Sequence, residues 1–252
     1  MGHLSLQEHE ELALGRMAIL TADLESGKRS AEDRERILFY LSLYGRVAAI
    51  AGLLVRADSG GFHQWLRRSA TWRRQLLREW TQGNRAVSRF TCTGVLGPLC
   101  DAIATGAEPI AREIAALSAT SWREGDEFED DFHYGRVLHA HLPEHEGPVE
   151  VEARISDLAR SSGPEEPPRL KVCQALVERD SDAFGKALHA LIDERAAWFQ
   201  ARVGGLAPEN SSFETDRFVF IEGLALVRLA ELRGMKVEEE YLFLPSLARV
   251  CP

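Results

Sequence analysis

The stretch Phe62-His-Gln-Trp-Leu-Arg-Arg-Ser-Ala-Thr-Trp-Arg-Arg-Gln-Leu-Leu-Arg-Glu-Trp-Thr81 repeats its large apolar side chains at helical spacing. Trp65, Trp72, Leu76 and Trp80 fall on one stripe, and arginines occupy the opposite face. A period near 3.6 residues is typical of an amphipathic α-helix that buries one face. We therefore expect a helix over Phe62–Thr81 with its tryptophans in the core and its arginines in solvent.

The same segment decides how charge is distributed along the chain. From Gly60 to Phe90 there are seven arginines against the single acid Glu79, a balance of +6, so the other residues sum to −15 within the net charge of −9. Most of such a surface would repel nucleic acid, because phosphate binding needs a basic footprint. We favour a solvated basic face. The second interpretation is a basic face that binds a partner protein. Nucleic-acid binding is the least favoured interpretation, so we expect no nucleic-acid partner.

Helical signals continue in both directions, whereas the period-two alternation typical of strands is nearly absent. The predicted fold class is therefore all-α. On the N-terminal side we expect a helix over Leu4–Leu24, whose apolar face carries Leu12, Ala13, Met17 and Leu20. A second helix is expected over Ala31–Arg56, with Ser30 as its cap and a break at Asp58–Gly61. On the C-terminal side we expect an irregular helix over Val87–Ala104, followed by helices over Ala107–Ser118, Phe128–His141 and Val149–Arg160. Two further helices are expected, one that ends near Trp198 and one from Phe213 to Leu232 that Gly234 ends. The chain should finish with an extended tail over Glu238–Pro245 and a last helical turn.

Two parts of the chain repeat the same order of features. Leu99-Cys-Asp-Ala-Ile-Ala104 and Val172-Cys-Gln-Ala-Leu-Val177 are each followed by a helix that ends near a tryptophan, a loop, and then Phe128-Glu-Asp-Asp131 or Phe213-Glu-Thr-Asp216. Such a repeated unit predicts antiparallel helix pairs stacked as a compact helical-repeat, solenoid-like array. We expect one domain over residues 1–252, with a possible division near residues 161–168 into parts 1–160 and 169–252.

Composition narrows the class of protein. With 45% hydrophobic and 27% charged residues, the chain has the composition of a globular protein rather than a disordered one. The N-terminus lacks a secretory signal, and the most apolar run, Val47–Val55, is too short to cross a bilayer, so we expect a cytoplasmic protein without a membrane span. The cysteines are scattered and are expected to be buried thiols: Cys92, Cys100, Cys173 and Cys251.

Histidines gather among acids between residues 133 and 145 and suggest a metal site, but their spacing argues against one. His139 and His141 diverge around a helix, and a proline precedes His145, which leaves His133 with Asp130 as one imperfect pair. We expect capping and surface roles for these histidines, and neither a metal nor a cofactor.

The sequence contains no motif for a nucleophilic serine, a phosphate-binding loop or a zinc protease. Helical enzymes can nevertheless assemble a site from distant residues. An all-α enzyme with Glu129, His133 and Glu222 in one cleft is therefore kept as the least favoured function.

The run Glu124-Gly-Asp-Glu-Phe-Glu-Asp-Asp131 is the densest acidic segment. A helix dipole stabilises carboxylates at its start by about 0.3–1 kcal/mol each, but neighbouring like charges repel one another. The surplus charge leaves two interpretations, a helix start and a surface that attracts a basic partner. The predicted partner-binding residues come from this run and from one near the C-terminus: Glu124, Asp126, Glu127, Glu129, Asp130, Asp131, Glu238, Glu239 and Glu240.

Three longer stretches carry a family resemblance. They are Phe128-Glu-Asp-Asp-Phe-His-Tyr-Gly-Arg-Val-Leu-His139, Val172-Cys-Gln-Ala-Leu-Val-Glu-Arg-Asp-Ser-Asp-Ala-Phe184, and Ile221-Glu-Gly-Leu-Ala-Leu-Val-Arg-Leu-Ala-Glu-Leu-Arg-Gly234 with Glu239-Glu-Tyr-Leu-Phe-Leu-Pro-Ser-Leu-Ala-Arg249 after it. In these stretches the chain resembles the immunity protein 49 family of bacterial polymorphic-toxin systems. The resemblance implies an intracellular antidote without catalytic residues or cofactor, encoded beside a toxin, that protects the producer by binding the toxin domain.

The function that we expect is therefore to cover the toxin's active site, by steric and electrostatic means. If the toxin is a nuclease or another enzyme with a basic substrate cleft, the predicted carboxylates could take the place of its substrate. The alternative from a different class is a helical-repeat adaptor or scaffold that receives a peptide or another regulatory partner.

Overall fold

The computed structural model describes residues 4–142, 148–203 and 212–249, which fold almost entirely into helices. It contains no strand within these residues, so the all-α fold class is confirmed. The elements are α1 (Leu6–Glu25), α2 (Ala31–Arg56), α3 (Ser59–Gln82), α4 (Gly97–Ala104), α5 (Glu108–Leu117), α6 (Glu129–Ala140), α7 (Pro148–Ser161), α8 (Pro168–Glu178), α9 (Ser181–Gln200), α10 (Phe213–Asp216), α11 (Ile221–Leu232) and a short 3-10 turn, η1 (Ser246–Ala248).

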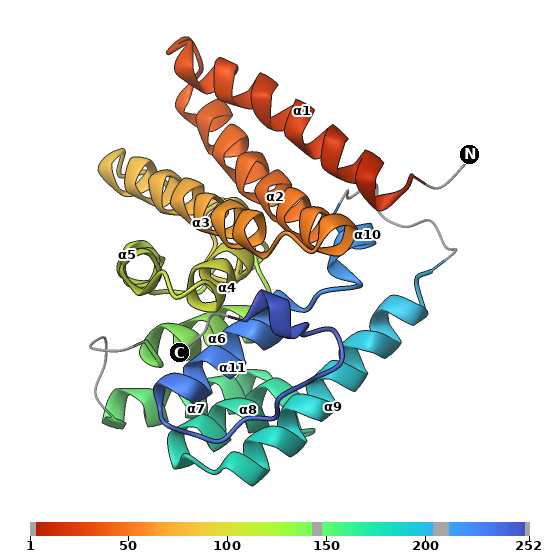
Figure 1. The fold of residues 1–252 in the computed structure, drawn as a ribbon. Helices are drawn as coiled ribbons and strands as arrows, with labels where there is room; N and C mark the ends of the chain where they lie inside the picture. Colours follow the sequence, from red (N-terminus) through yellow and green to blue (C-terminus); the bar gives the residue numbers. More distant parts are fainter. Residues whose placement is uncertain (1–3, 143–147, 204–211, 250–252) are drawn as a thin grey trace.

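Helices that are neighbours in sequence pack as pairs. α1, α2 and α3 form one end of the molecule and α7, α8 and α9 the other, with α4, α6 and α11 between them (Figure 1). α11 departs from this order, because its most extensive contact is with α4, far earlier in the chain. Helix pairs are therefore present, but the helical-repeat array stays a prediction.

One cluster of buried hydrophobic side chains runs from Ala13 in α1 to Ala248 in η1. Leu158 and Leu170, on either side of the possible boundary near residues 161–168, both belong to it. The division of the chain into domains also stays a prediction.

Several helix limits follow their local signals. Ser30 accepts a hydrogen bond from the backbone N–H of Asp33 at 3.1 Å and caps α2, which spans the predicted Ala31–Arg56. α3 begins earlier than predicted, because Asp58 accepts from the N–H of Gly61 at 2.8 Å and so caps a helix where we expected a break. α5, α6 and α7 match their predicted ranges to within one residue at each end.

α2 is long and apolar enough to cross a membrane by length and composition, with a mean hydropathy of 1.8 in its most apolar window. Of that window, 67% is buried inside the protein. Leu38, Leu41 and Ile50 have no exposed surface, because α2 packs along both α1 and α3. A central position in the core accounts for the apolar composition of this helix.

The apolar faces of α1 and α3 differ from those predicted. In α1, Ala13 and Met17 face the core as predicted, but Leu12 is 46% exposed. In α3, Leu66 and Leu76 are fully buried, but the tryptophans lie at the margin of the core stripe. Half-burial suits a side chain with an apolar ring and one polar N–H. The half-buried tryptophans are Trp65, Trp72 and Trp80.

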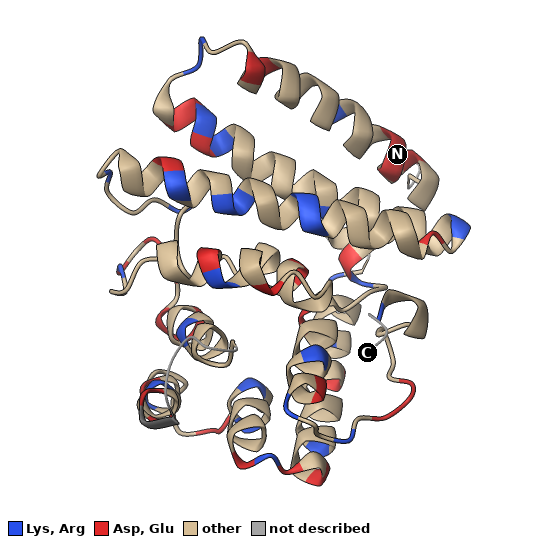
Figure 2. Ribbon diagram, turned by 60° about the vertical axis from the view of Figure 1, so that its left-hand side comes forward, with Lys and Arg blue, Asp and Glu red and all other residues tan. Residues whose placement is uncertain are grey.

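The predicted solvated basic face of α3 is confirmed for Arg67, Arg68 and Arg78, which are exposed, and is wrong for Arg73, which is buried. Some of these arginines also contact neighbouring helices. Arg74 and Arg78 pair with Glu113 of α5 at 3.3 and 2.7 Å. Arg67 donates to the carbonyl oxygen of Thr105 at 2.8 Å. Basic and acidic residues are accordingly interspersed along the helices (Figure 2). These arginines hold α3 against α4 and α5.

The predicted helix over Val87–Ala104 is wrong in its first part, because residues 83–96 form a loop and only α4 is helical. Arg73 of α3, which is 2% exposed, explains this. Its guanidinium donates to the carbonyl oxygens of Phe90, Thr91 and Cys92. A side chain that takes these backbone acceptors favours the loop over a helix.

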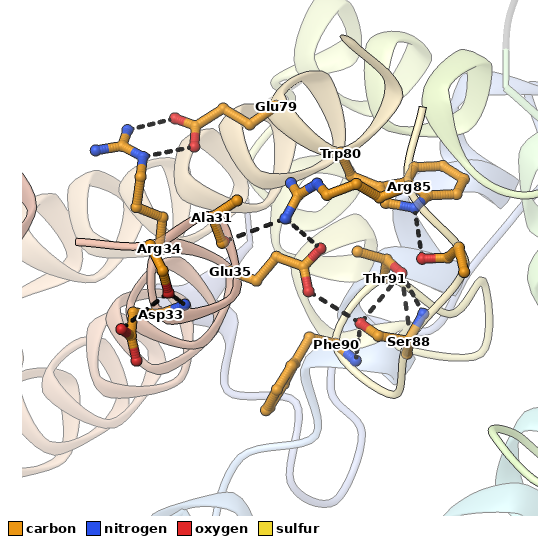
Figure 3. Close-up of polar contacts among 12 residues, drawn as sticks. Ala31, Asp33, Arg34, Glu35, Glu79, Trp80, Arg85, Ser88, Phe90 and Thr91 are labelled. Atoms are coloured by element: carbon orange, nitrogen blue, oxygen red, sulfur yellow. Dashed lines mark hydrogen bonds and ion pairs between the residues drawn. The ribbon is translucent and has the colours of Figure 1, made fainter. Parts of the chain in front are cut away.

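The same loop is tied to α2 and α3 (Figure 3). Arg85 pairs with Glu35 of α2 at 2.9 Å, and the Ser88 hydroxyl donates to the other oxygen of Glu35 at 3.2 Å. The indole N–H of Trp80 donates to the carbonyl oxygen of Ala86 at 3.0 Å. The loop is therefore fixed by side chains from both helices beside it.

The predicted helix from Phe213 to Leu232 is broken into α10 and α11. The Arg195 guanidinium of α9 donates to the carbonyl oxygen of Asp216 and, at 3.2 Å, to that of Val219. Because these two carbonyl oxygens accept hydrogen bonds from α9, the predicted helix from Phe213 to Leu232 is interrupted between α10 and α11.

The C-terminal tail follows its prediction only in part. Gly234 has a φ of +71°, the left-handed conformation expected where α11 ends. The residues after Gly234 are not helical. The tail is not extended throughout, because Tyr241 and Leu244 form an isolated antiparallel bridge. η1 supplies the predicted last helical turn.

Candidate functional site

The predicted acidic run surrounds the start of α6. Glu129, Asp130 and Asp131 form the first turn of this helix, and residues 124–128 precede it in a loop. We call residues 124–131 the acidic ridge. All of its residues except Asp130 line a hollow of about 580 Å³, together with Arg89 and Trp122. The ridge therefore borders a concave surface at the position of the loop 83–96.

The acidic ridge presents an aromatic side chain among exposed carboxylates. Phe128 is 77% exposed, the largest value for a bulky hydrophobic side chain in the described part of the chain. Large aromatic side chains that become buried on association often supply much of the binding energy of an interface. The exposed carboxylates are Glu124, Asp126, Glu129 and Asp130.

The other two carboxylates of the ridge take part in holding the fold. Glu127 accepts a hydrogen bond from the N–H of Gly94 at 2.5 Å, and burial raises the pKa of its carboxyl. Asp131 accepts from the Arg169 guanidinium at 3.0 Å, and burial raises its pKa as well. These two residues fix the ridge to the loop 83–96 and to α8.

Arg169 is the centre of a charged cluster that joins α6, α8 and α11. Its guanidinium donates to both carboxylate oxygens of Glu222, at 2.9 and 2.8 Å, besides Asp131. It also lies 4.7 Å from the centre of the Tyr134 ring. The Tyr134 hydroxyl donates to Glu222 at 3.0 Å, and burial raises the pKa of that hydroxyl well above its ordinary value. The cluster places one guanidinium between two carboxylates and ties α6, at the ridge, to α8 and α11.

This cluster contradicts the cleft considered for an enzyme. Glu129 and His133 form a weak pair at 3.7 Å, one helical turn apart. Glu222 instead bonds to Arg169 and to Tyr134, the residue after His133, and neighbours in a helix point about 100° apart. The three residues therefore do not share one site.

The histidines do not form a metal site in the described residues, where no group of three or more potential ligands is found. His139 and His141 are buried, which corrects the predicted surface roles. The Nδ1 atom of His141 accepts from the Arg233 guanidinium at 2.9 Å. Burial, with this positive charge beside it, lowers the pKa of His141 to about 3. His145 lies outside the described residues.

The cysteines are buried thiols wherever the structure describes them: Cys92, Cys100 and Cys173. Burial raises the pKa of Cys92 to about 11 and that of the other two further. At neutral pH these thiols stay protonated and are weak nucleophiles. Cys251 lies outside the described residues.

The second acidic run, Glu238–Glu240, lies apart from the ridge. All three residues are exposed, and Glu238 pairs with His189 in the N-terminal half of α9 at 2.8 Å. The ridge meets α9 near the other end of that helix, where Asp130 and Trp198 line one cavity. The structure therefore places the two predicted acidic runs at different parts of the surface.

That cavity was not predicted. It has a volume of about 380 Å³ and is lined by residues of α6, α7, α8, α9 and α11. Three of its lining residues were expected in other roles, Asp130 in partner binding, Glu222 in an enzyme cleft and Trp198 at the end of a helix.

The family model described as Immunity protein 49 matches residues 62–248, which include the acidic ridge and both hollows. No curated protein and no solved structure matches the chain.

Proposed function

The chain belongs to the immunity protein 49 family, and we propose that it is a cytoplasmic antidote that binds a cognate toxin domain and covers its active site. In this proposal the toxin is encoded by an adjacent gene, and the chain acts by binding and not by catalysis. Family membership supports the immunity function, while the surface that meets the toxin is inferred from the geometry of the chain.

The acidic ridge is the observation that favours this surface. Its exposed carboxylates surround an aromatic side chain that is 77% exposed. The Arg169 cluster and the bond from Gly94 to Glu127 hold the ridge in place before any partner arrives. A preformed surface loses little conformational entropy on binding, and its negative charge would speed association with a basic toxin cleft.

Charge reversal of the ridge tests the proposal. The variant Glu124→Lys, Asp126→Lys, Glu129→Lys leaves Glu127 and Asp131 in their structural bonds, so it should fold. We expect it to lose protection of cells that express the C-terminal domain of the neighbouring gene. Its association rate with that domain should fall at least tenfold and depend less on salt.

The matched control reverses three exposed acids of α1 and α2 that lie outside the ridge, Glu11, Glu25 and Glu32. It changes the net charge by the same amount and should protect as the wild type does. Equal protection by both variants would rule out the ridge as the toxin-binding surface. A domain that is harmless without the chain would rule out the immunity function itself.

A further inference from the structure

A small apolar pocket lies between α2, α3 and the start of α4. We call it the α2 pocket. Its volume is about 100 Å³. This is the space of about three water molecules, so the pocket suits one side chain rather than a larger ligand. Five apolar side chains line it: Phe39, Leu43, Leu76, Val95 and Pro98.

The polar residues that line the α2 pocket are bonded within the chain. The Ser42 hydroxyl donates to the carbonyl oxygen of Ser69 at 3.0 Å, and the Ser69 hydroxyl donates to Asp101 at 2.6 Å. Arg46 donates to the same carboxylate through Nε and Nη2, at 3.0 and 2.6 Å. The Arg73 guanidinium donates to carbonyl oxygens of the loop before α4.

These bonds leave the α2 pocket without a free ionic partner for an occupant. The carboxylate behind it, Asp101, has no exposed surface and is already paired with Arg46. The Nε atom of Arg73 has no acceptor, but it is itself buried, so an anion in the pocket could not reach it. An ion would lose its hydration there without compensation, whereas an apolar group gains contact with five apolar side chains.

Val95 connects the α2 pocket with the hollow beside the acidic ridge, because it lines both spaces. Five ridge carboxylates and one basic residue, Arg89, line that hollow. Of the five, Asp131 is paired with Arg169. The hollow is therefore negative. A partner segment that lies in the hollow and over the pocket would carry basic side chains beside an apolar one.

The hollow and the α2 pocket would contribute to binding in different ways. Exposed charges at the rim of an interface mainly raise the association rate. An apolar side chain that fills a pocket is a frequent binding hot spot, and its removal mainly raises the dissociation rate. The ridge supplies charge and one exposed ring, Phe128, while the pocket supplies a recess for a side chain of the partner.

From these contacts we infer that the α2 pocket receives one aliphatic side chain, of leucine, isoleucine or methionine, from a basic segment of the toxin domain. The inference rests on the proposed function for the identity of the partner. It extends the binding surface from the acidic ridge across Val95 to α2. Phe39 and Leu43 lie outside the residues 62–248 that the family model matches, so this part of the surface is particular to the N-terminal helices of the chain.

Binding kinetics of the full chain with the purified toxin domain of the neighbouring gene test the inference. Leu43→Gln places an amide at the half-buried wall of the pocket without changing the charge. Leu54→Gln is the matched control, on the same helix, 39% exposed and outside the pocket. We expect Leu43→Gln to raise the dissociation rate at least tenfold, with the association rate and its salt dependence within twofold of wild type. The control should leave both rates within twofold.

A second variant keeps the test decisive if Leu43→Gln does not fold. Val95→Met retains an apolar side chain and extends it at the boundary of the pocket, so it should obstruct the occupant and raise the dissociation rate in the same way. Circular dichroism and thermal unfolding show which variants are folded. A dissociation rate within threefold of wild type in the folded pocket variant, or an equal rise in Leu54→Gln, overturns the inference.

The two proposals fail separately. A toxin domain that binds the wild type and dissociates equally fast from the pocket variants keeps the immunity function and removes the α2 pocket from the interface. A toxin domain that does not bind the wild type removes the proposed function, and with it the partner of the pocket.

Discussion

Arg73 is the residue on which the connection from α3 to α4 most depends. Replacing it with methionine keeps the volume of the side chain but leaves the carbonyl oxygens of Phe90, Thr91 and Cys92 without their donor. Because buried acceptors without partners are costly, we expect Arg73→Met to lower the free energy of unfolding by about 2–4 kcal/mol. Urea denaturation measures this loss.

Arg68→Met is the matched control, since Arg68 is an exposed arginine of the same helix that lies over the Trp65 ring. It should cost less than about 1 kcal/mol. Similar losses in the two variants would mean that Arg73 does not hold the loop.

His141 makes the stability of the chain depend on pH. Its pKa in the folded protein is lowered to about 3, so between about pH 3 and its unfolded pKa near 6.5 the unfolded chain binds more protons. Stability from this residue is therefore complete above about pH 6.5 and is lost as the pH falls. At pH 4.5 the expected loss is about 2–3 kcal/mol relative to pH 8.

Comparing the pH dependence of unfolding in wild type and His141→Gln isolates this effect, because the other titrating groups are common to both. The wild type should lose more stability on acidification than the variant does. Parallel curves would show that His141 is not held neutral by burial and by Arg233.

At the scale of elements, substitutions at two glycines within helices distinguish the effect of helix propensity on stability from the effect of packing. A Cβ at Gly15 of α1 would meet nothing within 4 Å, whereas one at Gly223 of α11 would lie 2.6 Å from a ring atom of Phe220 and 3.1 Å from Leu244. We expect Gly15→Ala to stabilise the chain by about 0.5–1 kcal/mol. Gly223→Ala should destabilise it by about 1–3 kcal/mol despite the same gain in propensity.

Thermal and urea unfolding of the two variants check this pair. A gain in stability at Gly223 would contradict the close packing of α11 against Phe220 and the tail.

Local signals predicted the helices better than the breaks between them. Ser30 and Gly234 mark helix limits through their own conformations and were located from the sequence alone. The loop before α4 and the break before α11 depend on Arg73 and Arg195, which reach backbone atoms 17 to 24 residues away. No pattern within either segment contains that information.

The site shows the same limit. The acidic run was visible as a cluster of charges, but its division into exposed and structural carboxylates depends on distant partners. Gly94 and Arg169 lie 33 and 38 residues from Glu127 and Asp131. The cavity of about 380 Å³ is lined by residues of five helices, so the sequence did not show that Asp130, Trp198 and Glu222 would line one space.

At the scale of the whole molecule, the family match begins at residue 62, yet α1 and α2 belong to the same hydrophobic cluster as the matched part. Leu38, Leu41 and Val47 of α2 have no exposed surface. We expect a chain lacking residues 1–57 to expose the apolar face of α3 and to lose cooperative unfolding. Calorimetry of the shortened chain checks this, and a sharp unfolding transition would show that the matched part folds alone.

We propose that this member of the immunity protein 49 family inactivates a toxin domain by binding to it and covering its active site. The most direct test is to titrate the purified toxin domain of the neighbouring gene with the chain and to follow the toxin's activity. Occlusion predicts a linear fall that reaches zero at one molecule of chain per molecule of toxin, in a complex that can be isolated. Complete inactivation by far less than one equivalent, or full toxin activity within the isolated complex, would contradict it.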